Sequence, residues 1–459
     1  MSIFAILNQG GMKNLRYYAF LPLSLLCAFP LGSQLKAQVN ASNINGGDIN
    51  TITTAVPFLS IGPDSRAGGM GDVGVATSAD VNSIHWNPAK LVYTEKDMGF
   101  GISYTPWLRA LVPDISLSYL SFYKKIDRRG MSAVGGSLRY FTLGDIQFTD
   151  NTGANTIQVR PNEFALDLAY SRKLSDRFSG GLAIRFINSN LTQGQNVQGA
   201  DSRPGRTVAA DVSVYYQSDE FELFGKDAEW AWGANISNIG AKVSYTETTK
   251  RDFIPINLRL GPRLTFKLDD ANELAFTVDI NKLLVPTPPI YLRDTAGGLE
   301  IDDEGNPIIL AGADPERAVA SGMFGSFTDA PGTPVEDANG NVEQNADGTA
   351  VVEGGSVFRE EMREFMFAFG AEYWYDKQFS VRAGYFWEHA TKGNRKYITL
   401  GAGLRYNVFG LDFSYLIPAY FSANNTQQSP LQNTLRFSLT FDLEGIRSGL
   451  GGDGNNVVE

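Results

Sequence analysis

The feature that most constrains this chain is an alternation of apolar with polar or small residues, repeated over segments of about ten residues. Residues 435–443 read Leu-Arg-Phe-Ser-Leu-Thr-Phe-Asp-Leu, and residues 164–170 and 398–406 follow a similar pattern. Successive side chains of a β-strand point to opposite faces. Each segment therefore predicts a strand with one apolar face and one polar or small face.

Fourteen such segments follow one another, separated by breaks rich in turn-forming residues. They span 98–104, 115–124, 131–142, 162–173, 177–190, 206–217, 228–238, 256–268, 272–283, 364–376, 379–388, 396–406, 410–417 and 431–443. An even number is what a closed antiparallel barrel of the bacterial outer membrane requires. A soluble β-sandwich also alternates in this way, but two further features favour the membrane.

The first feature is the length of the links. After the fourth, eighth, tenth and twelfth segments the links are only "LSDR", "LDDA", "DKQ" and "NVF". The links after the third, fifth, seventh, ninth, eleventh and thirteenth segments are longer and more polar. Outer-membrane barrels have short periplasmic turns at one end and longer extracellular loops at the other. The links "KKIDRRG" and "SDEFELFGKDAE", after the second and sixth segments, fit less cleanly.

The second feature is the position of aromatic rings near segment ends, which is typical of the girdles at the two membrane interfaces. These rings are Trp107, Tyr123, Tyr140, Tyr170, Trp230, Trp232, Tyr373, Trp374, Tyr385, Trp387 and Tyr415. Ordinary cross-strand pairing explains some of them. We therefore predict an all-β fold, a 14-stranded antiparallel transmembrane β-barrel over residues 98–443. It lies in the cell outer membrane, and residues 444–459 form a periplasmic tail.

The N-terminus reads as a secretory signal peptide. Two basic residues precede the apolar stretch 17–31, and "LKAQ" follows it. We expect residues 1–37 to be removed, with Met12 as the true start and Gln38 as the first mature residue. A membrane anchor is the alternative, but the apolar stretch is short and contains two prolines.

Cysteine content and charge exclude several classes of function. The only cysteine, Cys27, lies inside the expected signal peptide and not at its cleavage point, where lipidation would need it. The mature chain therefore uses neither disulfides nor thiols. Removing residues 1–37 removes three basic residues and no acidic one, so the net charge changes from −11 to −14. Such an acidic exported protein is a poor candidate for binding nucleic acid.

Residues 38–97 do not alternate, so they form either a periplasmic domain or a hatch or plug inside the barrel. Gly68, Gly69 and Gly71 supply turns and close backbone approach. They resemble a phosphate-binding loop only superficially, because no strand precedes them and no Lys-Ser/Thr pair follows. The run Asn87-Pro88-Ala89 starts a turn, since proline pushes the residue before it out of helical geometry. We expect this turn to fix the hatch against the first strand.

The two histidines do not form an obvious catalytic or metal site. His85 lies in the non-alternating block, and His389 lies at the end of the eleventh segment. Two separated histidines without cysteine are a poor donor set for zinc, and no G-x-S-x-G motif supports a serine hydrolase. We interpret His85 as part of a packed turn and expect no catalytic residue, metal or cofactor.

The block "IGPDSRAGGMGDVGVA…NSIHWNPAKL" resembles the N-terminal signature of the FadL-like outer-membrane superfamily, in which Asn-Pro-Ala-x-Leu follows a glycine-rich hatch. Within that superfamily, residues 58–76 are similar to the PorV (LptO) family of the type IX secretion system. Lys90 stands where the superfamily often has glycine. The resemblance implies a non-enzymatic protein that binds the C-terminal signal domain of secreted cargo. It would pass this cargo from the translocon to the cell-surface attachment complex, which contains a sortase.

The polar face of the predicted strands carries thirteen charged residues. They are Arg139, Asp167, Arg185, Asp211, Arg259, Arg263, Asp279, Glu372, Arg382, Arg405, Asp412, Arg436 and Asp442. A charge on the lipid face costs about 2–4 kcal/mol at the midplane, so we assign all of them to the lumen. Opposite charges in a narrow lumen pair with one another, which favours a filled barrel over an open pore. All barrels, however, have polar interiors.

The link 286–358 is much longer than any other, and the alternation of links predicts that it is extracellular. It carries thirteen acidic and two basic residues. Its turn signals "ANGN" and "ADGT" favour a local hairpin. The stretch "DANGNVE" resembles a calcium loop, except that Val342 occupies the glycine position. The loop is either simply solvated or a docking surface, for which the candidate contacts are Asp302, Asp303, Glu304, Glu336 and Asp337.

Three functions compete: a cargo-binding secretion component, a FadL-type transporter of long-chain fatty acids or other hydrophobic compounds, and an outer-membrane enzyme such as a lipid A deacylase. The enzyme lacks a motif, and the transporter needs an apolar lumen or side exit. For the secretion component, the expected partners are translocon and attachment-complex subunits and the signal domains of cargo, together with outer-membrane lipid and lipopolysaccharide.

Overall fold

The computed structural model describes residues 49–109, 112, 114–127, 129–149, 155–194, 196–197, 200–246, 251–294, 297–337, 341–419 and 430–444. The expected signal peptide and nearly all of the expected tail lie outside this part of the chain. The described residues belong to one compact unit, Ala41–Glu459. No helix among them is long and apolar enough to cross a membrane.

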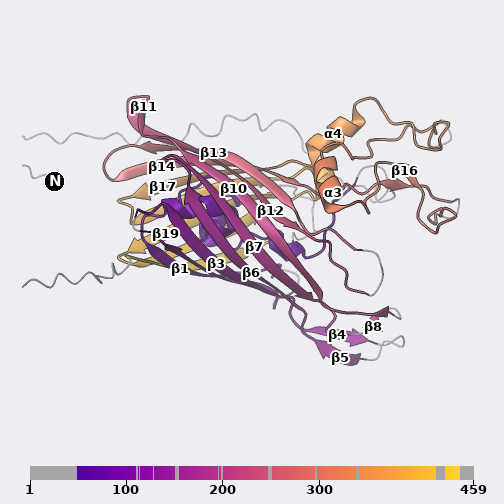
Figure 1. Ribbon diagram of the computed structural model, residues 1–459, viewed down its shortest axis with the longest axis horizontal. Coiled ribbons are helices and arrows are strands. Elements are labelled where there is room, and N and C mark those ends of the chain that lie inside the picture. The colour runs from indigo at the N-terminus through magenta and orange to yellow at the C-terminus, as the bar shows by residue number, and fades with distance from the viewer. Residues whose placement is uncertain are drawn as a thin grey trace, which may run out of the picture. The chain divides into compact units, whose positions relative to one another are not determined.

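Fourteen antiparallel strands form one closed sheet (Figure 1). They are β1 (Met98–Pro106), β2 (Ser116–Lys125), β3 (Ser132–Thr142), β6 (Asn162–Lys173), β7 (Phe178–Asn190), β10 (Gly205–Gln217), β12 (Lys226–Gly240), β13 (Asn257–Lys267), β14 (Asn272–Leu283), β17 (Met366–Tyr375), β18 (Phe379–Trp387), β19 (Lys396–Tyr406), β20 (Phe409–Pro418) and β21 (Thr434–Leu443). Strand β1 pairs with both β2 and β21, and β10 pairs with β12, which closes the ring. The predicted barrel is confirmed, and each strand differs from its predicted segment by three residues or fewer at either end.

The links alternate in length around the ring, as the sequence predicts. We call the two ends of the barrel the short-link end and the long-loop end. The long-loop end carries β4 (Ile146–Thr149), β5 (Asn155–Val159), β8 (Asn196–Val197), β9 (Ala200–Asp201), β15 (Ile290–Tyr291), β16 (Ile309–Ala311), α3 (Val319–Gly325), α4 (Ser356–Arg363) and η4 (Ala390–Lys392). The short-link end carries β11 (Phe221–Leu223), which extends β12 as a hairpin and explains why that link looks too long.

The outward face of the barrel is apolar. On β7, Leu182 and Ile184 are 58% and 60% exposed, whereas their neighbours Ala183 and Arg185 are each 3% exposed. The same alternation of exposed and buried residues runs along the other strands. A continuous exposed apolar surface of this kind is unfavourable in water and suits contact with lipid tails.

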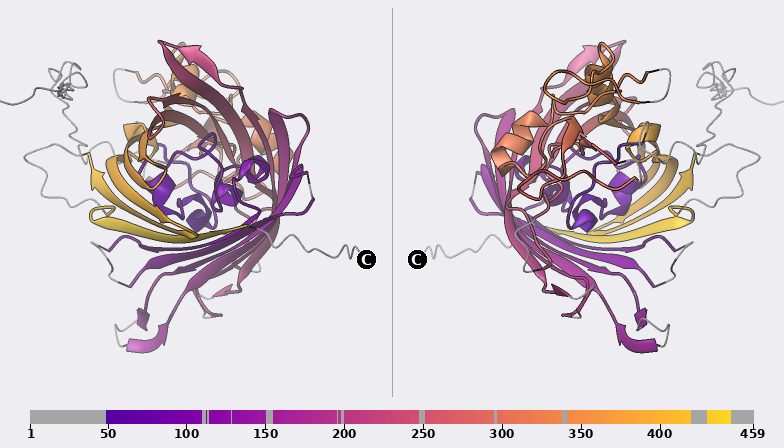
Figure 2. Two further views of the ribbon diagram at one scale, coloured as in Figure 1. Left: turned by 90° about the vertical axis from the view of Figure 1, so that its left-hand side faces the viewer. Right: turned by 90° about the vertical axis from the view of Figure 1, so that its right-hand side faces the viewer.

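The segment before β1, which we call the hatch segment (residues 49–97), contains no strand. It consists of η2 (Pro57–Ser60), α1 (Ser65–Gly68), α2 (Ser83–Trp86) and η3 (Pro88–Tyr93), joined by turns. Figure 2 shows this segment, in indigo, surrounded by the strands. It begins at the long-loop end, where the Asn50 amide donates to the Thr391 carbonyl at 3.0 Å. It leads into β1 at the short-link end.

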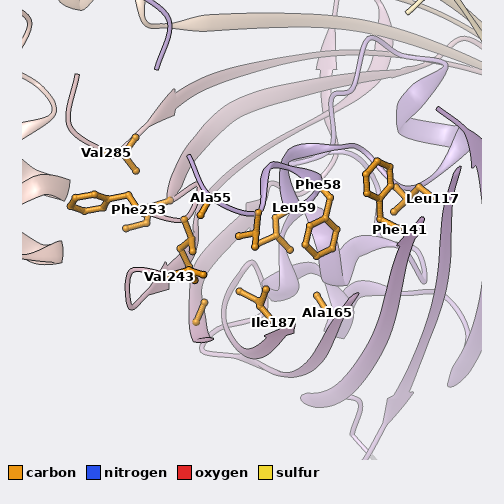
Figure 3. Packing of buried hydrophobic residues seen from close by; sticks show 14 of the residues in the cluster. Ala55, Phe58, Leu59, Leu117, Phe141, Ala165, Ile187, Val243, Phe253 and Val285 are labelled. Atoms are coloured by element: carbon orange, nitrogen blue, oxygen red, sulfur yellow. The ribbon is translucent and has the colours of Figure 1, made fainter. Parts of the chain in front are cut away.

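Apolar residues of the hatch segment pack on the inner wall near the long-loop end. Phe58 and Leu59 lie against Leu117, Phe141 and Ile187, which come from three different strands (Figure 3). All five side chains are at most 7% exposed. The main hydrophobic core is therefore an interface between the hatch segment and the barrel wall.

Candidate functional site

The thirteen charged residues assigned to the lumen lie on the inward face of their strands. Buried among them are Arg139, Asp167, Arg185, Asp211, Arg263, Asp279, Glu372, Arg382, Asp412 and Arg436. Arg259, Arg405 and Asp442 are partly buried. Because a buried charge is tolerated only when it is paired, the partners of these groups decide what the lumen can do.

A row of alternating charges crosses one side of the lumen. Arg66 of α1 donates two hydrogen bonds to Glu372 of β17, at 2.9 and 2.7 Å. Arg382 bridges Glu372 and Asp412, each at 2.7 Å. Arg405 then pairs with Asp412 at 2.8 Å. The row thus connects the hatch segment to four neighbouring wall strands, β17 to β20.

Two further contacts connect hatch carboxylates and amides to the wall. Asp72 pairs with Arg436 of β21 and accepts a hydrogen bond from the Tyr397 hydroxyl at 2.6 Å. Asp279 of β14 accepts hydrogen bonds from the amides of Gly74 and Val75, at 2.8 and 3.0 Å. These bonds satisfy hatch backbone groups that water would otherwise have to reach.

On the opposite wall the charges pair mainly with each other. Arg185 contacts Asp167 at 2.6 Å and Asp211 at 3.1 Å. Arg139 donates to the Leu59 carbonyl at 2.8 Å and faces Nδ1 of His85. His85 is therefore buried against a guanidinium group, which makes it a packed hatch residue and a poor general base.

The remaining luminal charges also have neighbours. Arg263 pairs with Glu229. Arg259 donates to Asn281 at 2.6 Å, and its guanidinium group lies 4.5 Å from the centroid of the Trp86 ring. Asp442 lies 3.5 Å from the Tyr123 hydroxyl.

The Asn-Pro-Ala turn fixes the hatch to a different part of the wall from the one expected. Asn87 has an extended backbone and caps η3 by accepting from the Ala89 amide at 3.0 Å, which confirms a turn start. Its amide group donates to Val75 and to Val214 of β10, at 2.9 and 3.0 Å. The Ala89 carbonyl accepts from Ser179 of β7 at 2.7 Å. The expected contact with β1 is therefore wrong, because η3 crosses the lumen and meets β7 and β10 before the chain returns to β1.

The glycines of the hatch segment allow its backbone to touch the wall. A methyl group on Gly69 would lie 3.0 Å from the Gly401 Cα atom of β19, so neither position has room for a side chain. Gly71 has a positive φ of 75°, and a side chain there would meet the Tyr385 backbone at 2.8 Å. Gly68 is covered by the Arg436 side chain. These contacts agree with the close backbone approach that the sequence suggests.

Sequence reasoning did not identify the paired charges of the hatch segment. Arg66 and Asp72 pair with the wall, whereas Asp64 and Lys90 form hydrogen bonds within the hatch segment. Arg66, Asp72 and Asp64 are all buried or nearly so, and Asp64 accepts from the Trp86 indole at 2.6 Å. Lys90 is 1% exposed and donates to the Gly74 carbonyl at 2.6 Å and to Thr77 at 2.9 Å. The available signal was the presence of these charges inside a glycine-rich block that was expected to lie in the lumen.

The long loop between β14 and β17 (residues 284–365) is tied to the barrel by a buried cluster of charges. Lys282 of β14 pairs with Glu361 and Glu364, at 3.1 and 2.6 Å. Lys392 of η4 also contacts Glu364 at 3.1 Å, and the Thr287 hydroxyl donates a hydrogen bond to the Glu364 carboxylate at 2.7 Å. Burial raises the pKa of the Glu361 carboxyl. The cluster holds α4 at the mouth of the barrel.

Beyond this base the loop folds into short hairpins, as its turn signals predict. Strands β15 and β16 pair antiparallel, and isolated bridges join Glu336 to Val342 and Gln344 to Ala350. Asp302 accepts from the Glu304 and Asn306 amides, at 3.0 and 2.8 Å, and so shapes a turn.

The candidate contact residues divide into two kinds. Asp337 accepts from the Asn341 amide at 2.9 Å and, like Asp302, shapes a turn. Asp303, Glu304 and Glu336 are exposed. Residues 338–340 of the calcium-like stretch lie outside the described residues. Among those that are described, no group of three or more His, Cys, Asp or Glu is placed to hold a metal ion.

Comparison with known proteins adds a family. Residues 44–290, more than half of the chain, match the family model described as "Type IX secretion system protein PorV". No curated protein sequence matches.

Three of the similar solved structures are outer-membrane channels. A TodX deltaS2S3 mutant monoaromatic hydrocarbon channel has 11% identity and a TM-score of 0.45, over 83% of this chain and 99% of that one. The Pseudomonas putida toluene transporter TodX has 10% identity and a TM-score of 0.42, over 86% and 98%. A Pseudomonas aeruginosa FadL homologue has 10% identity and a TM-score of 0.38, over 86% and 99%. Likenesses this distant carry no argument about what the present chain binds.

Proposed function

Because the chain belongs to the PorV family of type IX secretion system proteins and is an outer-membrane β-barrel, we propose that it binds the C-terminal signal domain of secreted cargo. It passes this cargo from the translocon to the attachment complex at the cell surface, which contains a sortase. In this proposal the long-loop end faces the cell exterior and the short-link end faces the periplasm.

The observation that carries the proposal is the occupied lumen. The hatch segment is joined to the wall by the pairs Arg66–Glu372 and Asp72–Arg436, and its apolar side chains pack on the opposite wall. Moving it would separate buried ion pairs and expose a hydrophobic core, both of which are costly. The protein therefore acts through its surface, as a docking protein, and not as a conduit for cargo.

The alternative functions find less support in the geometry. A transporter of hydrophobic compounds needs an apolar route, but the inward face carries the paired charges described above and the hatch segment lies across it. A lipid A deacylase needs an activated nucleophile, but His85 faces Arg139 and Nδ1 of His389 faces the Thr391 hydroxyl. Neither arrangement provides a serine with a base.

The long loop is the main candidate for the contact with partners. It carries most of the chain's excess negative charge, and its base is fixed by the cluster around Lys282 and Glu364. A rigid acidic surface speeds encounter with a basic partner and loses that advantage in high salt.

A charge-reversal variant tests this contact without disturbing the turns. D303K/E304K/E336K reverses three exposed acids and leaves Asp302 and Asp337 in place. We expect normal barrel assembly and at least a tenfold loss of cargo co-purification, about 1.4 kcal/mol. The matched control, D176K/D252K/E95K, reverses three exposed acids outside the loop and should bind cargo normally. Equal cargo recovery from both variants would show that these acidic residues of the loop do not contribute to cargo binding.

A further inference from the structure

The hairpin formed by β11 and β12 carries an aromatic residue at its tip. Leu223 pairs with Lys226, so Phe224 and Gly225 are the two central residues of the turn. Phe224 is 90% exposed. Both central residues have positive φ, 54° for Phe224 and 73° for Gly225. Figure 1 shows β11 at the short-link end of the barrel.

This tip is not what folding alone would select. Two-residue turns with positive φ at both positions strongly favour Asn-Gly, because a bulky side chain is strained in the left-handed region. Phenylalanine at such a position, with its ring in solvent, stabilises neither the turn nor the barrel. A strained, exposed aromatic residue points to a binding role.

The charges of the hairpin are equally unfavourable for folding. Glu222 and Asp227 lie directly opposite each other across the two strands, and both are exposed. Like charges at paired positions destabilise a hairpin. A basic partner would relieve this repulsion.

The base of the hairpin is held firmly by neighbouring links. Arg177 pairs with Asp219, and Lys267 pairs with Glu220. The Lys226 ammonium group also donates to the Leu268 carbonyl at 2.7 Å. These contacts limit the movement of the hairpin base before any partner arrives, which lowers the entropy lost on binding.

The tip lies beyond the region that faces lipid. Among the residues of β12 that pair with β13, Asp227 is the nearest to the tip. Phe224 therefore lies three residues, or about 10 Å, beyond that pairing. The first outward aromatic residue on β12 is Trp230, which lies about 20 Å from Phe224 along the strand. Phe224 is therefore too far out to belong to the aromatic girdle.

An open acidic cleft of about 650 Å³ lies beside the hairpin. Its lining includes five acidic residues and three lysines, together with Trp374. Two of those lysines, Lys226 and Lys267, are already engaged at the hairpin base. The surface next to Phe224 is therefore acidic, with an aromatic side chain in its wall.

We propose that this hairpin is a docking site for a protein on the short-link side of the membrane. The partner supplies an apolar socket for Phe224 and a basic rim that faces Glu222, Asp227 and the acidic cleft. The inference rests on the orientation given above, in which this side is the periplasm. It assigns the protein a second contact surface, at the opposite end from the long loop.

Two variants remove the docking features while improving the hairpin. Phe224→Asn supplies the residue that the turn prefers, and E222T/D227T replaces the repelling pair with good strand formers. Both should leave the thermal midpoint unchanged or higher. Both should also lower secretion several-fold while cargo co-purification, which reports on the long-loop end, stays normal. Normal cargo co-purification by the loop variant, together with reduced secretion by the hairpin variants, would thus count against the proposed function and leave the docking site standing.

Photo-crosslinking in living cells identifies what touches the tip. Benzoylphenylalanine is placed at position 224 and, as a control, at Leu174, which is 65% exposed in another link at the same end. We expect a protein adduct at position 224 at least about ten times stronger than at 174, and its loss when E222K/D227K is added. An adduct that contains lipid or a second copy of this chain would overturn the proposal. So would normal secretion by F224N.

Discussion

At the scale of single residues, the buried pair between Arg66 and Glu372 is the clearest link between hatch and wall. Two of the three Arg66 guanidinium nitrogens and both Glu372 oxygens take part in the pair, and the two side chains are 7% and 6% exposed. Such a pair is not necessarily stabilising as a whole, because removing two charges from water is costly. Removing Arg66 is a different matter, because it leaves the buried Glu372 with Arg382 as its remaining ion-pair partner and takes Asp80 away from its own pair with Arg66.

The variant R66M should therefore lower the free energy of unfolding, by less than the cost of a fully unpaired buried charge, about 3–5 kcal/mol, because Arg382 still faces Glu372. The double variant R66M/E372M should recover part of that loss, since the buried carboxylate is removed together with its partner and Arg382 keeps Asp412. Thermal unfolding of the purified barrel measures both. R160A, which breaks the exposed pair with Asp145, should cost no more than about 1 kcal/mol. A double variant less stable than R66M would contradict the explanation.

Asn87 offers a second test at this scale, because one side chain joins η3, the loop at Val75 and strand β10. N87A should remove a cap and leave the Val75 and Val214 carbonyls without their partner, at a total cost of about 2–3 kcal/mol. We expect a lower unfolding temperature and, in planar bilayers, higher ion leakage past a loosened hatch. An unfolding temperature and an ion leakage equal to those of the wild type would show that the Asn-Pro-Ala motif is an ordinary turn.

At the scale of elements, the long-loop end is held together by short caps and ion pairs and not by long helices. The link from β18 to β19 is an example. Nδ1 of His389 caps η4 by accepting from the Thr391 amide at 3.2 Å. Lys392 of the same turn then reaches Glu360 and Glu364 beside α4. One histidine therefore helps to position the long loop.

This cap predicts a pH response. Partial burial, together with the nearby Arg363, Lys396 and Lys392, lowers the pKa of His389. A group with a lowered folded pKa stabilises the fold above its unfolded value, about 6.5, and that stability is lost as the pH falls through the folded pKa. Hydrogen exchange of residues 388–396, corrected for intrinsic rates, should therefore speed up below about pH 6.5. H389N keeps a cap that does not titrate and should abolish the change. An unchanged response in H389N would assign it to another group.

At the scale of the whole molecule, the barrel combines an apolar outer belt with a lumen that the hatch segment occupies (Figure 2). The closed strand order leaves no free edge in the ring, as a sheet in a membrane requires, because backbone groups that face lipid need hydrogen-bond partners. The hatch segment then occupies the space that an open channel would need.

The intact protein should consequently behave as a heat-modifiable barrel with little conductance. In planar bilayers we expect long closed periods, and in liposomes no fatty-acid uptake above that of empty vesicles. Intact-mass measurement of the native protein should place its first residue at Gln38. Steady large-conductance channels, or saturable fatty-acid uptake, would favour a transporter instead.

The sequence by itself determined the strands, because lipid on one side and a polar lumen on the other force a strict alternation of apolar with polar or small residues. This alternation is visible in a short stretch of sequence. It also indicated which charges point inward, since Arg185 or Asp279 on the lipid face would be prohibitively costly.

Tertiary structure alone decided the partners of these charges. Arg66 and Glu372 are 306 residues apart, and no local pattern encodes such a pairing. The same holds for the turn at Asn87, which was readable from its proline. The contacts of Asn87 with β10 and of Ala89 with β7 depend on the path of the hatch across the lumen. The tip at Phe224 is an intermediate case. Its Phe-Gly pair was visible in a link that seemed too long, but only the fold shows that the ring is left exposed beyond the membrane, because exposure depends on every neighbouring link.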